Sequence, residues 1–190
     1  MNCLWLLFSY LLGSIPFGLL IGKIVAKKDV RQQGSGNIGA TNVTRMMGKK
    51  YGALVLLLDG LKSAVPIILY KMLNNNSEVV LSMIAFIAII GHCFPVWLNF
   101  KGGKGVSSAL FAIIALDYRL AIVAILVWLI VYVFFKIVSA ASLFAMLMTT
   151  IASCFFGHFI LMCFLTILIF YTHRENIKKI INGEELKFRK

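Results

Sequence analysis

Long apolar runs alternate with short polar stretches along this chain. The runs cover residues 4–21, 52–73, 79–98, 106–116 and 120–138, and the stretch 139–171 is long enough for two short helices divided at Gly157. A run of about 20 apolar residues crosses a bilayer as an α-helix. The pattern therefore predicts an all-α, polytopic integral membrane protein with seven transmembrane helices, of which the fourth, sixth and seventh are short. Five spans with re-entrant pieces are the alternative.

Composition agrees with this fold class. Of 190 residues, 61% are hydrophobic and 14% are charged, whereas soluble domains have roughly 45–50% apolar and about 25% charged residues. A chain of this length has no room for a separate soluble domain, so we expect one membrane-embedded domain over residues 1–190.

The net charge is large and is unevenly distributed along the chain. Lys and Arg number 19 against 7 Asp and Glu, a formal net charge of +12. The excess lies in segment 23–50, in the loop 101–104, at Lys136 and in the tail after residue 173. Positively charged loops face the cytoplasm, which predicts an N-terminus outside and a cytoplasmic C-terminus. Such loops also suit an anionic substrate, whereas nucleic acid is excluded because the basic residues lie between spans.

Segment 34–45 has the composition of an anion-binding loop. Closely spaced glycines can turn successive backbone N–H groups inward, and Arg45 can hold phosphate oxygens with two hydrogen bonds. The further candidate donors are Ser35, Gly36, Asn37, Gly39, Thr41 and Asn42. The alternative is a polar loop in which the glycines only make turns.

A second glycine-rich loop, Lys101-Gly-Gly-Lys-Gly105, precedes the fourth apolar run. The start of a helix presents unpaired N–H groups and the positive end of its dipole. Gly102, Gly103 and Lys104 therefore become phosphate-binding candidates, although a simple turn with topology-setting lysines is also consistent. Two such loops on one face favour a phosphate site.

Three groups inside or beside the spans need a partner or a role. An unpaired charge at the membrane centre costs at least about 2.5–3.5 kcal/mol, so Asp59 and Lys62, three residues apart, should pair or face the site. His92 can bind phosphate, act as acid or base, or cap its helix.

Further candidates lie near the end of the chain. His173 and Asn176 share a face if the tail begins as a helix. Ser142 either reaches the site or acts as a capping or packing residue.

The sequence lacks the residue patterns that several kinds of catalytic site require. There is no acidic cluster for a two-metal site, no His-x4-Asp pair and no Gly-x-Ser-x-Gly motif. We therefore predict no metal, no cofactor and no acyl-enzyme.

Three motifs together resemble one family. Ser35-Gly-Asn-Ile-Gly-Ala-Thr-Asn-Val-Thr-Arg45, Gly91-His-Cys-Phe-Pro-Val-Trp-Leu-Asn-Phe-Lys-Gly-Gly-Lys-Gly-Val106 and His173-Arg-Glu-Asn-Ile177 are similar to those of the PlsY-type acyl-phosphate:glycerol-3-phosphate acyltransferases of bacterial membranes. The resemblance covers essentially the whole chain. Ile38 stands where many members have Pro, and Ser63 where Gly is usual.

The resemblance implies transfer of an acyl group from acyl phosphate to the 1-hydroxyl of glycerol 3-phosphate, giving lysophosphatidic acid and inorganic phosphate. Members use neither acyl-CoA nor acyl carrier protein directly and need no metal. The donor's own phosphate would accept the hydroxyl proton, with His92 as the rival base. The implied location is the bacterial inner membrane, with the active site facing the cytoplasm, and the partners are the two substrates and membrane lipids. The sequence sets no oligomeric state.

We distribute the candidates accordingly. Acyl phosphate is expected on Ser35, Gly36, Asn37, Gly39, Thr41, Asn42, Gly102, Gly103 and Lys104, and glycerol 3-phosphate on Arg45, Lys104, Ser142, His173 and Asn176. The residues expected to carry catalysis are Lys104, Arg45, Ser35 and His92. A transporter of an anionic metabolite is the competing class, but the polar motifs gather on one face and no internal repeat is evident.

Overall fold

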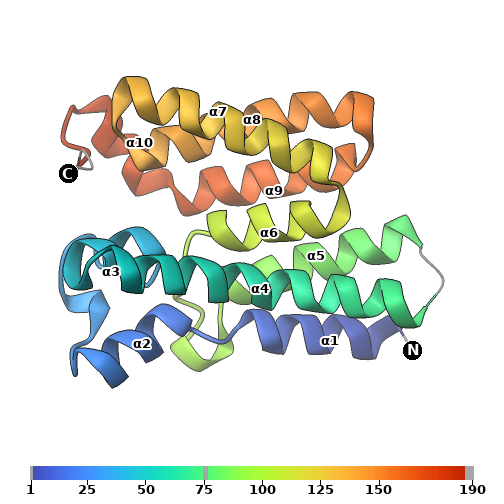
Figure 1. Ribbon diagram of the computed structural model, residues 1–190, viewed down its shortest axis with the longest axis horizontal. Helices are drawn as coiled ribbons and strands as arrows, with labels where there is room; N and C mark the ends of the chain where they lie inside the picture. The colour runs from blue at the N-terminus through green and yellow to red at the C-terminus, as the bar shows by residue number, and fades with distance from the viewer. Residues whose placement is uncertain (1, 75–76, 187–190) are drawn as a thin grey trace. The chain divides into compact units, whose positions relative to one another are not determined.

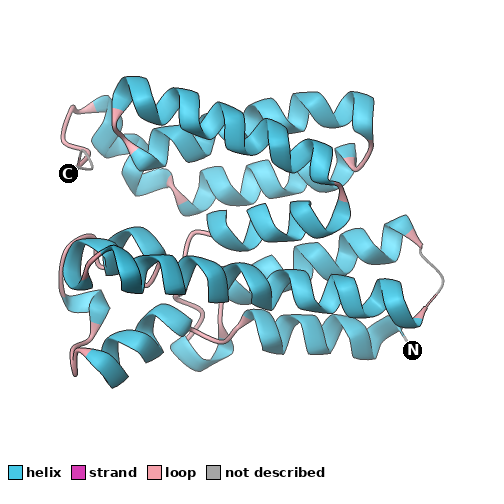
Figure 2. Cartoon of the chain, in the orientation of Figure 1, coloured by secondary structure: helices cyan, strands magenta, loops and turns pink. Residues whose placement is uncertain are grey.

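A computed structural model describes residues 2–74 and 77–186 of the chain. Every regular element in this part of the chain is helical (Figures 1 and 2). Part of the expected polar turn at 74–77 and the last four residues of the basic tail lie outside the described residues. The predicted all-helical class is confirmed.

The chain divides into two compact units, Met1–Ala115 and Leu116–Lys190. The expectation of one membrane domain over the whole chain stays a prediction. The first unit contains α1 (Asn2–Gly13), α2 (Phe17–Val25), η1 (Val30–Gln32), α3 (Ala40–Met47), α4 (Lys49–Leu73), α5 (Glu78–Cys93), η2 (Val96–Leu98) and nearly all of α6 (Val106–Leu116). The second unit contains α7 (Tyr118–Phe135), α8 (Val138–Phe156), α9 (Phe159–Thr172) and α10 (Arg174–Ile181).

Five stretches of the described chain are long and apolar enough to cross a bilayer, and α9 with α10, bent by 63°, makes a sixth if the pair is one span. The fourth and seventh predicted runs are short, as expected: α6 has 11 residues and α9 has 14. The expectation of a short sixth helix is wrong. The structure continues α8 for 19 residues to Phe156, and Gly157 follows as its C-cap with a φ of 95°.

The first apolar run forms two helices instead of one. α1 ends at Gly13 and α2 begins at Phe17, directly after Pro16. Proline has no N–H to continue the hydrogen bonds of α1, which explains the break.

α1 packs closely against α5. A Cβ at Gly13 would collide with the backbone of Ala88, and one at Gly91 with the backbone of Tyr10. Tyr10 also donates its hydroxyl hydrogen to the carbonyl of Phe94, over 2.8 Å. The absence of side chains at these two glycines lets the helix backbones approach each other.

α6 lies along α4 and is fixed to it at both ends. The hydroxyls of Ser107 and Ser108 donate to the carbonyls of Leu56 and Asp59, at 2.6 and 2.9 Å. At the other end, Lys71 Nζ donates to the carbonyl of Ala115 over 2.6 Å, which provides a donor for one of the last carbonyls of α6. α4 and α6 therefore run in the same direction.

In the second unit, α8 packs against both α7 and α9. Asp117 caps α7 by accepting the Arg119 N–H over 2.8 Å. Hydrogen bonds from Arg119 lower the pKa of Asp117 below its usual value. Between α8 and α9, the hydroxyls of Thr150 and Thr166 lie 2.6 Å apart.

Candidate active site

The first glycine-rich loop is built around the side chain of Asn42, which is 1% exposed. Its amide nitrogen donates to the carbonyls of Val30, Gln33 and Asn37, at 2.8, 3.2 and 2.9 Å. Its oxygen accepts the Ser35 N–H over 2.9 Å. Asn42, expected to contact acyl phosphate, is thus the internal scaffold of the loop.

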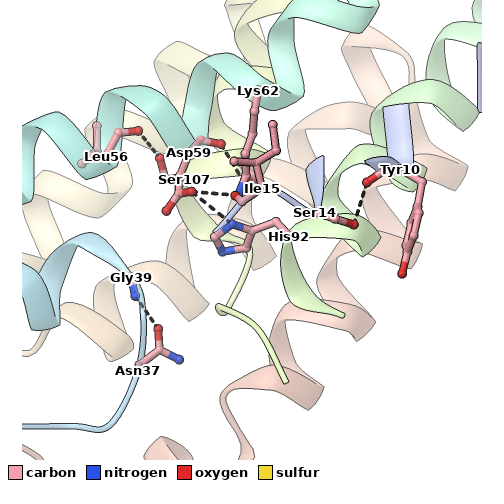
Figure 3. Close-up of polar contacts among 11 residues, drawn as sticks. Tyr10, Ser14, Ile15, Asn37, Gly39, Leu56, Asp59, Lys62, His92 and Ser107 are labelled. Carbon is pink, nitrogen blue, oxygen red and sulfur yellow. Dashed lines mark hydrogen bonds and ion pairs between the residues drawn. The ribbon is translucent and has the colours of Figure 1, made fainter. Parts of the chain in front are cut away.

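Several backbone donors of this loop are engaged in building it. The Gly36 N–H donates to Gln33, and the Gly39 N–H to the side-chain oxygen of Asn37, over 2.8 Å (Figure 3). These two N–H groups and the N–H of Ser35 are hydrogen-bonded within the loop, so they do not point together toward one anion-binding position. The side chain of Ser35 is on the exposed side of the loop.

A small apolar core anchors the first glycine-rich loop to the rest of the first unit. Val30, Ile38 and Val43 are buried together with Leu19 and Val55. Ile38, the position where the resemblance showed a departure, is 2% exposed and contributes to this core. The departure therefore leaves the loop anchored.

α3 presents the remaining polar groups of the first motif. Thr41 lies in the first turn and Arg45 in the last turn of this eight-residue helix. A separation of four residues places them on the same helix face, and Arg45 is exposed. This face combines a hydroxyl with a guanidinium, a pair that suits phosphate oxygens.

The second glycine-rich loop is paired with the end of α5. The N–H groups of Gly102 and Gly103 donate to the carbonyls of Cys93 and His92, at 3.0 and 3.1 Å. These bonds satisfy carbonyls that the helix end leaves open. A Cβ at Gly102 would collide with the carbonyl oxygen of His92, and one at Gly103 with the His92 ring. Both glycines permit this packing, and their N–H groups are already engaged.

Lys104 follows directly and is half-buried, two residues before α6 begins. The prediction that this lysine precedes a helix start is confirmed.

Asp59, Lys62 and His92 form a buried cluster between α4 and α5 (Figure 3). Lys62 Nζ lies 2.8 Å from Asp59 Oδ1 and donates to the carbonyl of Ile15 over 2.6 Å. His92 Nδ1 lies 3.6 Å from the same carboxylate oxygen. The expectation that Asp59 and Lys62 pair is confirmed.

The second unit holds the other three expected residues. Ser142 is buried, donates to the Val138 carbonyl over 2.9 Å and accepts the Trp128 indole N–H over 3.2 Å. The buried ring of His173 lies with Nδ1 2.8 Å from the Ile169 carbonyl. The Ser142 hydroxyl thus bonds to α7 and to its own helix, and its place in the site stays a prediction.

The tail begins as a helix, α10, which meets the condition that the sequence left open. His173 lies directly before α10 and Asn176 lies within it. The Asn176 amide donates to Glu185 Oε1 over 2.6 Å, and the Ser139 hydroxyl donates to the same oxygen over 2.7 Å. The sequence analysis missed Glu185, because nothing in its neighbourhood marks a contact with a residue 46 positions away.

Within residues 2–74 and 77–186, no three His, Cys, Asp or Glu side chains are grouped so that they could hold a metal ion.

The chain matches known proteins over nearly its whole length. Residues 3–183 match the family model described as glycerol-3-phosphate acyltransferase. A glycerol-3-phosphate acyltransferase of Wolbachia pipientis is 43% identical, with 96% of each chain covered. One from Pelagibacter ubique is also 43% identical, over 95% of this chain and 94% of the relative.

Two crystal structures of PlsY, an integral membrane glycerol 3-phosphate acyltransferase, are similar to this chain at 39% sequence identity. The glycerol 3-phosphate form has a TM-score of 0.92, with 99% of this chain and 96% of that one covered. The lysophosphatidic acid form has a TM-score of 0.89, with 99% and 95% covered.

Proposed function

The chain belongs to the glycerol-3-phosphate acyltransferase family, and we propose that it acylates the 1-hydroxyl of glycerol 3-phosphate with an acyl phosphate. The hydroxyl oxygen bonds to the acyl carbon, the carbon–oxygen bond to phosphate breaks, and the departing phosphate takes the hydroxyl proton. The products are lysophosphatidic acid and inorganic phosphate. The observation that carries the proposal is the near-complete match to PlsY in both its glycerol 3-phosphate and lysophosphatidic acid forms.

The residue chemistry suits this donor. Acyl phosphate is a mixed anhydride and is already activated, so an enzyme nucleophile would gain little. What the protein must supply is the juxtaposition of two anions and the stabilisation of the leaving phosphate. Hydroxyls and fixed cations perform both tasks.

For the donor phosphate we assign Ser35, Thr41 and Lys104 as direct contacts. The exposed Ser35 side chain and the shared face of Thr41 and Arg45 support this assignment. Asn42, Gly102 and Gly103 serve the same site by shaping the two loops, because their polar groups are engaged within the protein. Gly36, Asn37 and Gly39 complete the first loop.

For glycerol 3-phosphate we assign Arg45 and Lys104 in the first unit and His173 and Asn176 in the second. Arg45 offers a planar fork that matches two phosphate oxygens, and Lys104 a compact charge. Ser142 supports this subsite from within α8, because its hydroxyl bonds to Val138 and Trp128.

The proton acceptor in this proposal is the donor phosphate. His92 is 4% exposed and its Nδ1 faces a buried carboxylate oxygen. A general base must reach the proton that it removes, and a buried ring in an ion-pair cluster favours substrate assistance over catalysis by His92.

We further propose seven membrane crossings with the N-terminus outside, and with both glycine-rich loops and the tail in the cytoplasm of a bacterial cell. The distribution of the net charge of +12 over these segments supports this orientation. The site then faces the compartment that holds glycerol 3-phosphate.

The test offers purified protein glycerol 3-phosphate with palmitoyl phosphate, palmitoyl-CoA or palmitoyl acyl carrier protein. We expect lysophosphatidic acid and an equal amount of phosphate from palmitoyl phosphate alone. Turnover only with a thioester would overturn the assigned donor. The competing class, an anion transporter, requires uptake of glycerol 3-phosphate into vesicles without any acylated product.

A further inference from the structure

The interior of the first unit contains three ionisable side chains in one cluster. Asp59, Lys62 and His92 are 1%, 3% and 4% exposed. Buried charges are unfavourable unless they are paired, and apolar side chains of similar volume often replace them without loss of stability. Stability alone therefore gives a weak reason for this cluster, and a functional reason is worth seeking.

The cluster lies beside the Nδ1 edge of the His92 ring. Asp59 Oδ1 lies 3.6 Å from His92 Nδ1, an ion-pair distance and longer than a hydrogen bond. The same oxygen lies 2.8 Å from Lys62 Nζ, outside good hydrogen-bond geometry within the described part of the chain. Lys62 is in turn fixed by the Ile15 carbonyl. Asp59 therefore stands between a cation and the imidazole.

The Nε2 end of the His92 ring meets the second glycine-rich loop. A Cβ on Gly103 would collide with Nε2, Cε1 and Cδ2 of the ring, so the ring packs directly on the glycine backbone. The Gly103 N–H also donates to the His92 carbonyl over 3.1 Å. The residue that follows is Lys104. The contacts thus lead from Asp59 through His92 to Gly103 and the lysine.

We infer that Asp59 and His92 are positioning residues that fix the backbone of Gly103 and thereby the place of Lys104. In this arrangement Lys62 neutralises Asp59, and the imidazole serves as a rigid support. The inference rests on the proposed function, in which Lys104 holds phosphate. It accounts for a buried ion pair that the transfer of the acyl group does not itself use.

The first experiment adds a methyl group at Gly103 and then removes the His92 ring that this methyl group would meet. Gly103→Ala adds a methyl group where the ring lies, and displacement of a binding group by about 1 Å can lower turnover about 100-fold. Removing the ring in Gly103→Ala/His92→Ala makes room for that methyl. We expect the double variant to recover at least about tenfold in kcat/KM over Gly103→Ala, with a matching recovery of Tm.

Recovery of this kind separates a support from a base, because removing a catalytic base cannot raise activity. A double variant no more active than Gly103→Ala overturns the inference. So does loss of all turnover in His92→Ala with Tm unchanged.

The second experiment tests whether Asp59 affects turnover by holding His92. Asp59→Asn leaves Lys62 buried without its partner and is expected to destabilise the fold, so Asp59→Asn/Lys62→Met removes both charges together. We expect this variant to lower kcat about tenfold while Tm stays close to wild type. In a His92→Ala background, the same change should lower kcat by no more than about twofold, because residues that act through one another are not additive.

A control variant removes a different ion pair. Asp117→Asn/Arg119→Met acts on the start of α7, outside the proposed site, and should leave kcat unchanged. Losses that multiply across the Asp59 and His92 backgrounds would overturn the inference. A wild-type enzyme inactive on acyl phosphate would refute the proposed function instead, and Lys104→Ala with full activity would refute the assigned role of that lysine.

Discussion

The side-chain amide of Asn176 donates a hydrogen bond to the carboxylate of Glu185 over 2.6 Å. The Ser139 hydroxyl donates to the same oxygen over 2.7 Å. Asn176 is one of the groups that we assign to glycerol 3-phosphate. Its side-chain amide is therefore bonded to the anionic Glu185, although the proposed ligand of this amide is an anionic substrate. In the proposed site, the tail carboxylate and the substrate phosphate would compete for this amide.

Glu185→Gln should therefore improve binding of glycerol 3-phosphate. Without the carboxylate charge, the Asn176 amide is released more easily and a nearby repulsion disappears. Glu185 is only partly buried, and a charge pair open to solvent contributes about 0.2–1 kcal/mol, so we expect KM for glycerol 3-phosphate to fall up to about fivefold while kcat is unchanged. Glu184→Gln, next along the chain and exposed, is the matched control. A rise in KM would mean that Glu185 instead holds Asn176 in its binding position.

Replacing Asn42 should act on the fold as well as on the reaction. Asn42→Ala leaves buried carbonyls, among them that of Val30, without their donor, and each such group costs about 1–3 kcal/mol. We expect a clear drop in Tm together with a loss of turnover. Wild-type Tm with lost turnover would show that Asn42 contacts the substrate and has no scaffold role. Asn37→Ala, which removes only the bond to Gly39, should lower Tm less.

The two assigned cations should matter for the reaction and little for the fold. Arg45→Ala and Lys104→Ala are each expected to lower kcat/KM by about 10²–10³, the range typical for a group that stabilises developing charge. Lys101→Ala removes an exposed lysine of the same loop and should stay within about twofold of wild type. Thermal unfolding in detergent checks that both inactive variants remain folded. Wild-type rates in either would remove that residue from the site.

Asp29 gives a pH dependence of known sign. Hydrogen bonds from Arg31 lower the pKa of Asp29 from 3.8 to about 2. A carboxylate whose pKa falls on folding stabilises the protein above its unfolded pKa, and loses that contribution as pH falls from about 4 to 2. The Tm difference between wild type and Asp29→Asn should thus be small and positive at pH 6 and vanish near pH 2. A difference that grows on acidification would contradict this ion pair.

The sequence predicted the helices because their signal is local: apolar runs of sufficient length need no knowledge of their neighbours. The pairing of Asp59 with Lys62 was predictable for the same reason, since three residues along a helix place both side chains together. The cause of the break in the first run is also local, because Pro16 lies directly before α2. The residues on both sides of Pro16 are apolar, so the hydrophobic pattern alone predicts one continuous helix.

The residue types of the two loops predict a phosphate site, but they do not show which role each residue has. A loop composition cannot distinguish an amide that contacts substrate from one that supports the loop, and Asn42 proves to support it through bonds to residues five, nine and twelve positions away. Gly102 and Gly103 look like anion-binding glycines, yet their packing depends on where α5 ends. Contacts between distant segments, such as Ser139 with Glu185, leave no trace in either segment.

The bonds that join α6 to α4 also fix the level along α4 at which α6 begins. Ser107 and Ser108 meet Leu56 and Asp59, which lie about seven to ten residues into α4 from its start at Lys49. At 1.5 Å per residue, this level is about 10–15 Å below the end of the helix. In the proposed reaction, the water-soluble acceptor would meet Lys104 close to this level of α4, while the fatty chain of the donor stays among the lipids.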